Sequence, residues 1–152
     1  MSKELNRHKI REKALQALFP LNFNIDLTKE DAIKNALTFE YSDEVIDEEE
    51  KNFIPVYLDV LVTGVITKKD EIDQLITKHL AAKWELQRLA KIDLVILRLA
   101  IFEIQYIDEE KMPNIAALNE AIELAKTFSE EKSSKFINGI LSNILKERQQ
   151  YV

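Results

Sequence analysis

The chain has 152 residues, of which 46% are hydrophobic, and its formal net charge is −6 at pH 7. This length and apolar content allow one domain or two small subdomains with a buried core, and they argue against disorder of the whole chain. Cysteine is absent, which excludes disulfides and thiolate chemistry, and the widely separated His8 and His79 favour no metal site and no cofactor. The charged N-terminus and the lack of a long apolar run argue against a signal peptide or a membrane span, so we expect a cytoplasmic protein.

The chain has only two glycines and three prolines, the residues that most favour tight turns, and this scarcity indicates long helices. The spacing of apolar residues predicts helices over residues 2–19, 31–39, 49–67, 69–80, 86–106, 114–128 and 133–148. We expect Ser133 to be the N-cap of the last helix, Pro20 to end or kink the first, and the acidic residues 41–50 to form a surface loop. The predicted fold is all-α, with about seven helices in two packed helical subdomains, residues 1–67 and 68–152.

Basic residues are concentrated at the start of the chain. Residues 3–13 contain five lysines and arginines against two acids. Arg7 and Arg11 are like charges at i and i+4, which destabilise an isolated helix by roughly a few tenths of a kcal/mol. This basic N-terminal tip therefore indicates RNA binding, although a solvated helix end also explains it. Lys132 and Lys135 form a second cationic group at the predicted start of the last helix, where backbone amides can receive an anion.

Five segments resemble, in order and spacing, those of a known family. They are RHKIREKALQALF at residues 7–19, YLDVLVTGV at 57–65, the stretch 72–103 with its ILRLA, NEAIELAK at 119–126 and KFING at 135–139. Through these segments the chain resembles the NusB family of bacterial transcription antitermination factors over essentially its whole length. The resemblance implies an all-α bundle, without catalytic activity, that binds boxA, a short single-stranded element of ribosomal RNA transcripts. It also implies a heterodimer with the small-subunit ribosomal protein NusE, acting with other Nus factors on the RNA polymerase elongation complex.

The resemblance also assigns candidate RNA-binding residues. They are Arg7, His8, Lys9, Arg11, Phe19, Lys132, Lys135 and Phe136. His8 and Lys9 replace arginines that are frequent in the family, and Lys132 stands where an acid is common. Phe19 replaces a tyrosine and so keeps a surface on which a base can stack, although Phe19 and Phe136 both also suit a core position.

Acidic side chains are the expected surface for the protein partner. NusE-type ribosomal proteins are basic, so a negative surface would attract one and speed the encounter. Glu85 and Asp93 are the expected partner contacts. Because Asp93 lies in an apolar helix, an ion pair with Arg88 or Arg98 is the alternative role for its carboxylate.

Two other functions remain open from the sequence. NusB-like domains also occur fused to ribosomal RNA cytosine methyltransferases, in which case the chain would be an RNA-targeting module. It has no Gly-rich cofactor turn, no cysteine nucleophile and no α/β pattern, so we expect no enzyme. The second alternative is a protein-interaction bundle without an antitermination role, for example a homodimer that masks the basic tip. The sequence does not decide between a monomer and a homodimer.

Overall fold

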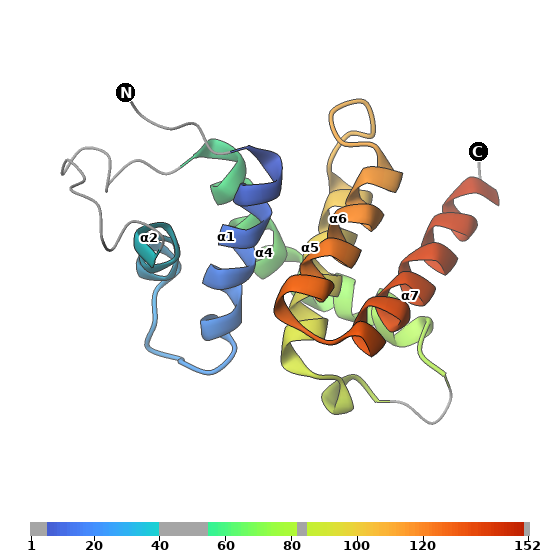
Figure 1. Ribbon diagram of the computed structural model, residues 1–152, viewed down its shortest axis with the longest axis horizontal. Coiled ribbons are helices and arrows are strands. Elements are labelled where there is room, and N and C mark those ends of the chain that lie inside the picture. The colour runs from blue at the N-terminus through green and yellow to red at the C-terminus, as the bar shows by residue number, and fades with distance from the viewer. Residues whose placement is uncertain (1–5, 40–54, 82–84, 151–152) are drawn as a thin grey trace. The chain divides into compact units, whose positions relative to one another are not determined.

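The computed structural model describes residues 6–39, 55–81 and 85–150, without the side chains of residues 39, 149 and 150. Within these ranges it contains six α-helices, one short 3₁₀ helix and no strand (Figure 1). The elements are α1 (Arg7–Leu21), α2 (Lys29–Phe39), α4 (Val56–Lys78), η1 (Leu86–Arg88), α5 (Lys91–Tyr106), α6 (Asn114–Phe128) and α7 (Glu131–Gln150). The predicted all-α class is confirmed, with six described α-helices where about seven were predicted. The loop predicted at residues 41–50 lies outside the described residues.

The helix α4 runs across the division of the chain into two compact units, Met1–Ile66 and Thr67–Val152. The sequence predicted two helices here, separated near residue 68, but α4 is continuous from Val56 to Lys78. The predicted break is wrong because residues 66–68 are isoleucine, threonine and lysine. Each of these residues has a backbone N–H donor, unlike proline, and each has a less flexible backbone than glycine. The boundary between the units therefore falls within one helix.

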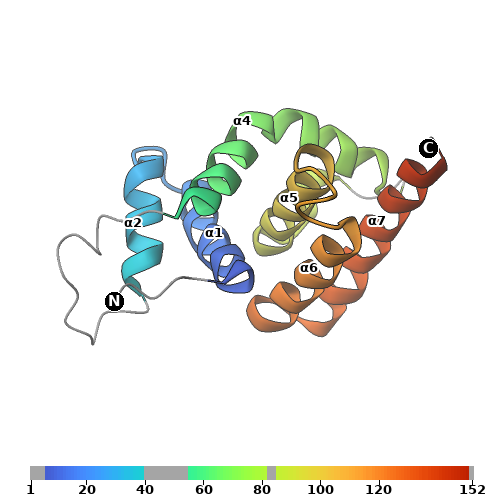
Figure 2. The ribbon, with the colours of Figure 1, turned by 90° about the horizontal axis from the view of Figure 1, so that it is seen from above.

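In the N-terminal unit, α1 packs against α2 (Figure 2). The buried apolar side chains of α1, α2 and the first half of α4 include Ala14, Leu15, Leu18, Ile33, Leu37, Leu58, Leu61 and Val62. The helix α1 begins at an N-cap, where Asn6 Oδ1 accepts the backbone N–H of Lys9 at 2.8 Å. It runs through Pro20 to Leu21, so the end predicted at Phe19 is too early. The missing donor of Pro20 is tolerated because the helix ends directly after it.

In the C-terminal unit, α5 is the central helix, and α6 and α7 pack on it and on each other (Figure 2). Every residue from Asp93 to Ile104 is buried, as expected for a helix that is mostly apolar on all sides. The bounds of α6 agree with the prediction, with Pro113 directly before the helix and Ser129 directly after it. The proline marks the start because it cannot continue a preceding helix.

The helix α7 begins at Glu131, so the N-cap predicted at Ser133 is wrong. The backbone N–H of Ser133 donates to the Glu130 carbonyl at 3.0 Å, and that of Ser134 donates to the same carbonyl at 3.2 Å. The first turn has therefore formed before Ser133 is reached. This frees the Ser133 hydroxyl for a contact outside its own helix.

A bidentate ion pair fixes the second half of α4 to α5. Arg98 donates from Nε to Asp73 Oδ1 at 2.8 Å and from Nη2 to Asp73 Oδ2 at 2.9 Å. The side chains are 8% and 17% exposed, respectively, so this charge-assisted contact is largely shielded from solvent. The ion pair with Arg98 that the sequence suggested for Asp93 is made by Asp73 instead.

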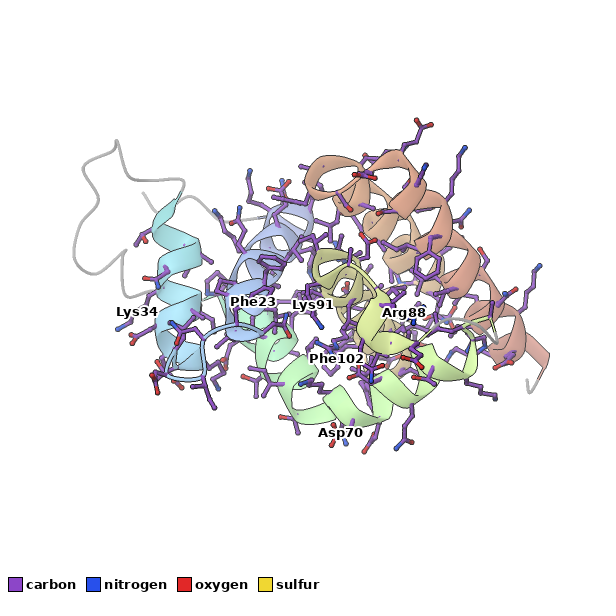
Figure 3. The ribbon with its side chains drawn as sticks, turned by 90° about the horizontal axis from the view of Figure 1, so that it is seen from below. Phe23, Lys34, Asp70, Arg88, Lys91 and Phe102 are labelled. Carbon is purple, nitrogen blue, oxygen red and sulfur yellow. The ribbon has the colours of Figure 1, made fainter. Side chains whose placement is uncertain are left out.

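Tyr106, at the end of α5, is tied to α4 by a short hydrogen bond. Its hydroxyl donates to Glu71 Oε2 at 2.6 Å, and the Lys68 ammonium lies 5.3 Å from its ring centroid. The ring stacks on that of Phe102, which is labelled in Figure 3, with centroids 5.5 Å apart. The hydrogen bond to Glu71, followed by burial and the charge of Glu71, raises the pKa of Tyr106 from 10.0 to about 12. The folded state thus favours the neutral phenol, which contributes to the free energy of unfolding. This contribution is lost as the pH rises from 10.0 through about 12.

A spectrophotometric titration of the tyrosines tests this assignment. We expect one tyrosinate component with a midpoint near pH 12, because the Glu71 carboxylate opposes a second negative charge beside it. Glu71→Gln should move this component back toward pH 10.0, and Tyr106→Phe should remove it. Circular dichroism over the same pH range would establish that the helices persist. Unchanged titration curves in both variants would contradict the assignment.

Gly139 is exposed in the interior of α7, and a Cβ added there meets no atom within 4 Å. Gly139→Ala should raise the free energy of unfolding by about 1 kcal/mol, because glycine is disfavoured by that amount relative to alanine inside a helix. Urea unfolding measures the change. Lys146→Ala, at an exposed position of the same helix, is the control and should stay within about ±0.5 kcal/mol. A loss of stability in Gly139→Ala would mean that this side of α7 is less open than described.

Candidate nucleic-acid interface

The first turn of α1 carries Arg7, His8 and Lys9 and no acidic residue. Arg7 and His8 are exposed, and Lys9 is half-buried. The unpaired N–H groups at a helix start form the positive end of the helix dipole, where a cation costs about 0.3–1 kcal/mol. These side chains therefore reinforce a positive potential that already favours anions. The arrangement suits contact with phosphate.

The three side chains differ in their partners. His8 Nε2 lies 3.1 Å from Glu12 Oε1, and Lys9 Nζ lies 3.3 Å from Glu12 Oε2. The Arg7 guanidinium instead lies over the ring of Tyr57, with Cζ 3.7 Å from the ring centroid. In the described part of the chain, no carboxylate lies within ion-pair distance of Arg7. Arg7 is therefore the member of the group whose charge is least compensated.

Arg11 does not share this exposure. Its side chain is only 3% exposed, so the expectation that it belongs to an exposed helix start is wrong. The reason is helical periodicity, since Arg11 falls on the same stripe of α1 as the buried Ala14, Leu15 and Leu18. The apolar pattern of the sequence carried this information, but the charge of Arg11 was given more weight.

The two aromatic residues among the candidate RNA-binding residues are partly exposed. Phe19, on α1, and Phe136, on α7, are both half-buried. The Phe19 ring packs edge to face against Phe23, which is labelled in Figure 3, with centroids 5.1 Å apart. Phe23 itself is 63% exposed. Both candidate rings thus keep a part that solvent reaches, and Phe19 also makes an aromatic contact.

At the start of α7, Lys132 and Lys135 are both exposed. Ser134 is buried, and its hydroxyl donates to the Glu131 carbonyl at 2.7 Å within the first turn. The turn therefore orients its serines inward and leaves the two lysines at the surface, as the sequence predicted for a cationic group at this helix start.

Asp93 connects this turn to α5. One carboxylate oxygen lies 2.8 Å from the donating hydroxyl of Ser129, and the other lies 2.8 Å from that of Ser133. The two hydroxyl oxygens are 2.9 Å apart. Asp93 is 7% exposed and forms no ion pair among the residues that the structure describes. Its carboxylate thus holds the junction of α6 and α7 on α5.

The other partner-binding candidate, Glu85, is exposed and directly precedes η1. The two acids expected to contact a protein partner therefore occupy different environments. The Glu85 carboxylate is accessible to a partner, whereas both carboxylate oxygens of Asp93 accept hydrogen bonds from serines inside the unit.

The sequence analysis did not identify Tyr57 as a neighbour of Arg7. The two residues belong to different helices, and no local sequence pattern connects them.

The described ranges contain no group of three or more histidine, aspartate and glutamate side chains that could hold a metal ion. No helix within those ranges is long and apolar enough to cross a membrane.

Comparison with known proteins identifies the family. The NusB family profile matches residues 8–146. The transcription antitermination protein NusB of Enterococcus faecalis is 59% identical over 148 residues, covering 97% of this chain and 94% of that protein. The corresponding protein of Lactiplantibacillus plantarum is 46% identical, with 95% and 97% covered.

Solved structures resemble the fold over a similar length. A structure of T. maritima NusB has a TM-score of 0.76 and 34% identity, with 95% of this chain and 94% of that chain covered. A chain in the structure of antitermination factors NusB and NusE in complex with dsRNA has a TM-score of 0.72 and 23% identity, with 93% and 96% covered, which shows likeness of fold alone. With its profile matched from residue 8 to residue 146 and relatives of this identity over nearly its whole length, the chain belongs to the NusB family.

Proposed function

We propose that this chain is a transcription antitermination factor that binds boxA-type single-stranded RNA of ribosomal RNA transcripts together with the ribosomal protein NusE. The observation that carries the proposal is the first turn of α1, which presents Arg7, His8 and Lys9 at the positive end of a helix and contains no acidic residue. Such a helix start favours phosphate oxygens. Relatives that are 59% and 46% identical to this chain are named as transcription antitermination proteins.

In this proposal, phosphate contacts and base contacts come from different residues. Arg7, His8 and Lys9 bind phosphates, and Lys132 and Lys135 add a second basic group. Phosphate contacts fix the position of an RNA strand but carry no sequence information. Recognition of boxA therefore requires unpaired bases to be stacked or hydrogen-bonded beside these groups.

Phe19 and Phe136 are the proposed stacking surfaces, because both rings are partly exposed. A stacked base contributes about 1–3 kcal/mol, which is enough to separate one sequence from another. Arg11 has an indirect role in this account. With 3% of its side chain exposed, it contributes positive charge to the α1 start without touching the RNA.

We propose the acidic part of the surface as the docking region for NusE. A basic protein is attracted to a chain of net charge −6, and Glu85 is an exposed acid available for contact. Asp93 acts indirectly, by holding the start of α7 in place through Ser129 and Ser133. The predicted subdomains, residues 1–67 and 68–152, would together form one NusB-like domain.

The assembled complex would act in the cytoplasm on the RNA polymerase elongation complex with other Nus factors. The chain itself would perform no chemical step. Its contribution would be to bring RNA and protein together, and binding by a monomer or a homodimer satisfies this role.

Replacing Arg7 and Lys9 together by alanine should weaken binding of a boxA-like RNA. The loss of about two phosphate contacts should also make the log–log salt slope less negative by about 1.4. Lys69→Ala with Lys126→Ala is the matched control, because it removes the same net charge from exposed positions elsewhere. Fluorescence anisotropy at several salt concentrations gives both quantities. Equal weakening by the two double variants would remove the assignment of RNA binding to the α1 start.

The role of the partner is tested by adding NusE to the same titration. We expect tighter binding and a steeper salt slope, because a basic partner adds phosphate contacts and offsets the repulsion of RNA by the acidic chain. A scrambled RNA of the same composition, measured with both proteins at matched salt, should bind more weakly. If it binds as tightly as the boxA-like strand, the protein reads no sequence and the antitermination proposal fails.

A further inference from the structure

Tyr57 is the side chain that holds Arg7 in place. It lies near the start of α4, and its ring centroid is 3.7 Å from Arg7 Cζ. Both residues belong to the unit Met1–Ile66, so the contact lies within one compact body. Arg7 is exposed and Tyr57 is half-buried, which leaves the guanidinium accessible while the ring is anchored in the unit.

A ring face holds an arginine in a different way from a carboxylate. The electron-rich face attracts the cation through its quadrupole, and it neither neutralises the charge nor accepts the N–H donors. The neighbouring cations show the contrast, because His8 and Lys9 both lie against the carboxylate of Glu12. Arg7 thus keeps its full charge and its planar fork of donors, the form in which arginine binds phosphate in a bidentate manner.

The contact also reduces the cost of binding. A free arginine side chain has many rotamers, and ordering it on a ligand costs entropy. An arginine already held over a ring has lost part of this freedom before the ligand arrives. The first turn of α1, residues 7–10, contains no acidic side chain that could hold Arg7 in place of the ring.

We infer that Tyr57 is a positioning residue for RNA binding, which holds the Arg7 guanidinium ready for a phosphate group. The inference rests on the proposed function, because it assumes that Arg7 contacts RNA. Tyr57 itself need not touch the RNA, and its effect passes through Arg7.

A double-mutant cycle with a boxA-like RNA tests this role. Tyr57→Leu should weaken binding by about two- to fivefold, the range expected when an arginine side chain that was already ordered must instead be ordered on binding. Tyr57→Phe should keep wild-type affinity, because the ring face remains. In the Arg7→Ala background, Tyr57→Leu should have no further effect, since the group that it positions is gone. Tyr106→Leu is the matched control: its ring also lies against a cation, Lys68 at 5.3 Å, but neither residue is a proposed RNA contact, so RNA affinity should not change.

A second substitution tests the electrostatic cause without changing the shape of the core. Replacing Tyr57 by pentafluorophenylalanine keeps a ring of similar size but reverses its quadrupole, so the affinity should fall below that of Tyr57→Phe. Far-UV circular dichroism would establish that each variant is folded. If Tyr57→Leu fails to fold, the comparison between the two phenylalanine forms decides the question.

The possible results separate this inference from the function on which it rests. If Arg7→Ala leaves RNA affinity unchanged, the proposed RNA face is wrong and Tyr57 has nothing to position. If Arg7→Ala weakens binding but Tyr57→Leu and the fluorinated ring do not, the RNA face stands and the role of Tyr57 is wrong. Equal weakening by Tyr57→Leu with and without Arg7 would likewise overturn it, because Tyr57 would then act independently.

Discussion

At the start of α1, Arg7, His8 and Lys9 crowd a helix end that already carries the positive half of the helix dipole. Local electrostatics therefore oppose this arrangement, and the Asn6 cap offsets only part of the cost. The rest of the support comes from packing, because the opposite stripe of α1, around Leu15, is buried. Hydrophobic burial thus stabilises the helix that bears these charges, and Arg7 keeps its charge without a carboxylate of the described residues beside it.

At the start of α7, too, the residues that stabilise the helix are different from the residues that carry the exposed charge. The exposed Lys132 and Lys135 are held by contacts that they do not make themselves, since the turn before them is anchored by Asp93 on the buried helix α5. A carboxylate satisfied by two hydroxyl donors is a low-cost way to bury a charge, because its hydrogen bonds replace those of water. Asp93, expected from the sequence to face a partner, thus supports a surface and does not form it.

The sequence predicted what depends on local pattern and missed what depends on distant contacts. The all-α class and the bounds of α6 followed from helical periodicity and Pro113, both readable within a few residues. The break predicted near residue 68 was wrong because residues 66–68 contain neither the proline nor the glycine that would end a helix. The burial of Arg11 was readable from its stripe on α1, but the contact between Arg7 and Tyr57 joins separate helices and no local pattern reports it.

The central claim is that RNA binds to cations at two helix starts, one in each unit. Mapping of backbone amide chemical shifts by NMR, with a boxA-like single strand added to the isolated protein, tests it most directly. We expect the largest shifts at the amides of Arg7, His8 and Lys9 and across residues 132–136, because basic side chains there stand at the positive end of a helix dipole. Large shifts confined to other segments, such as α2, with these amides unmoved, would contradict it.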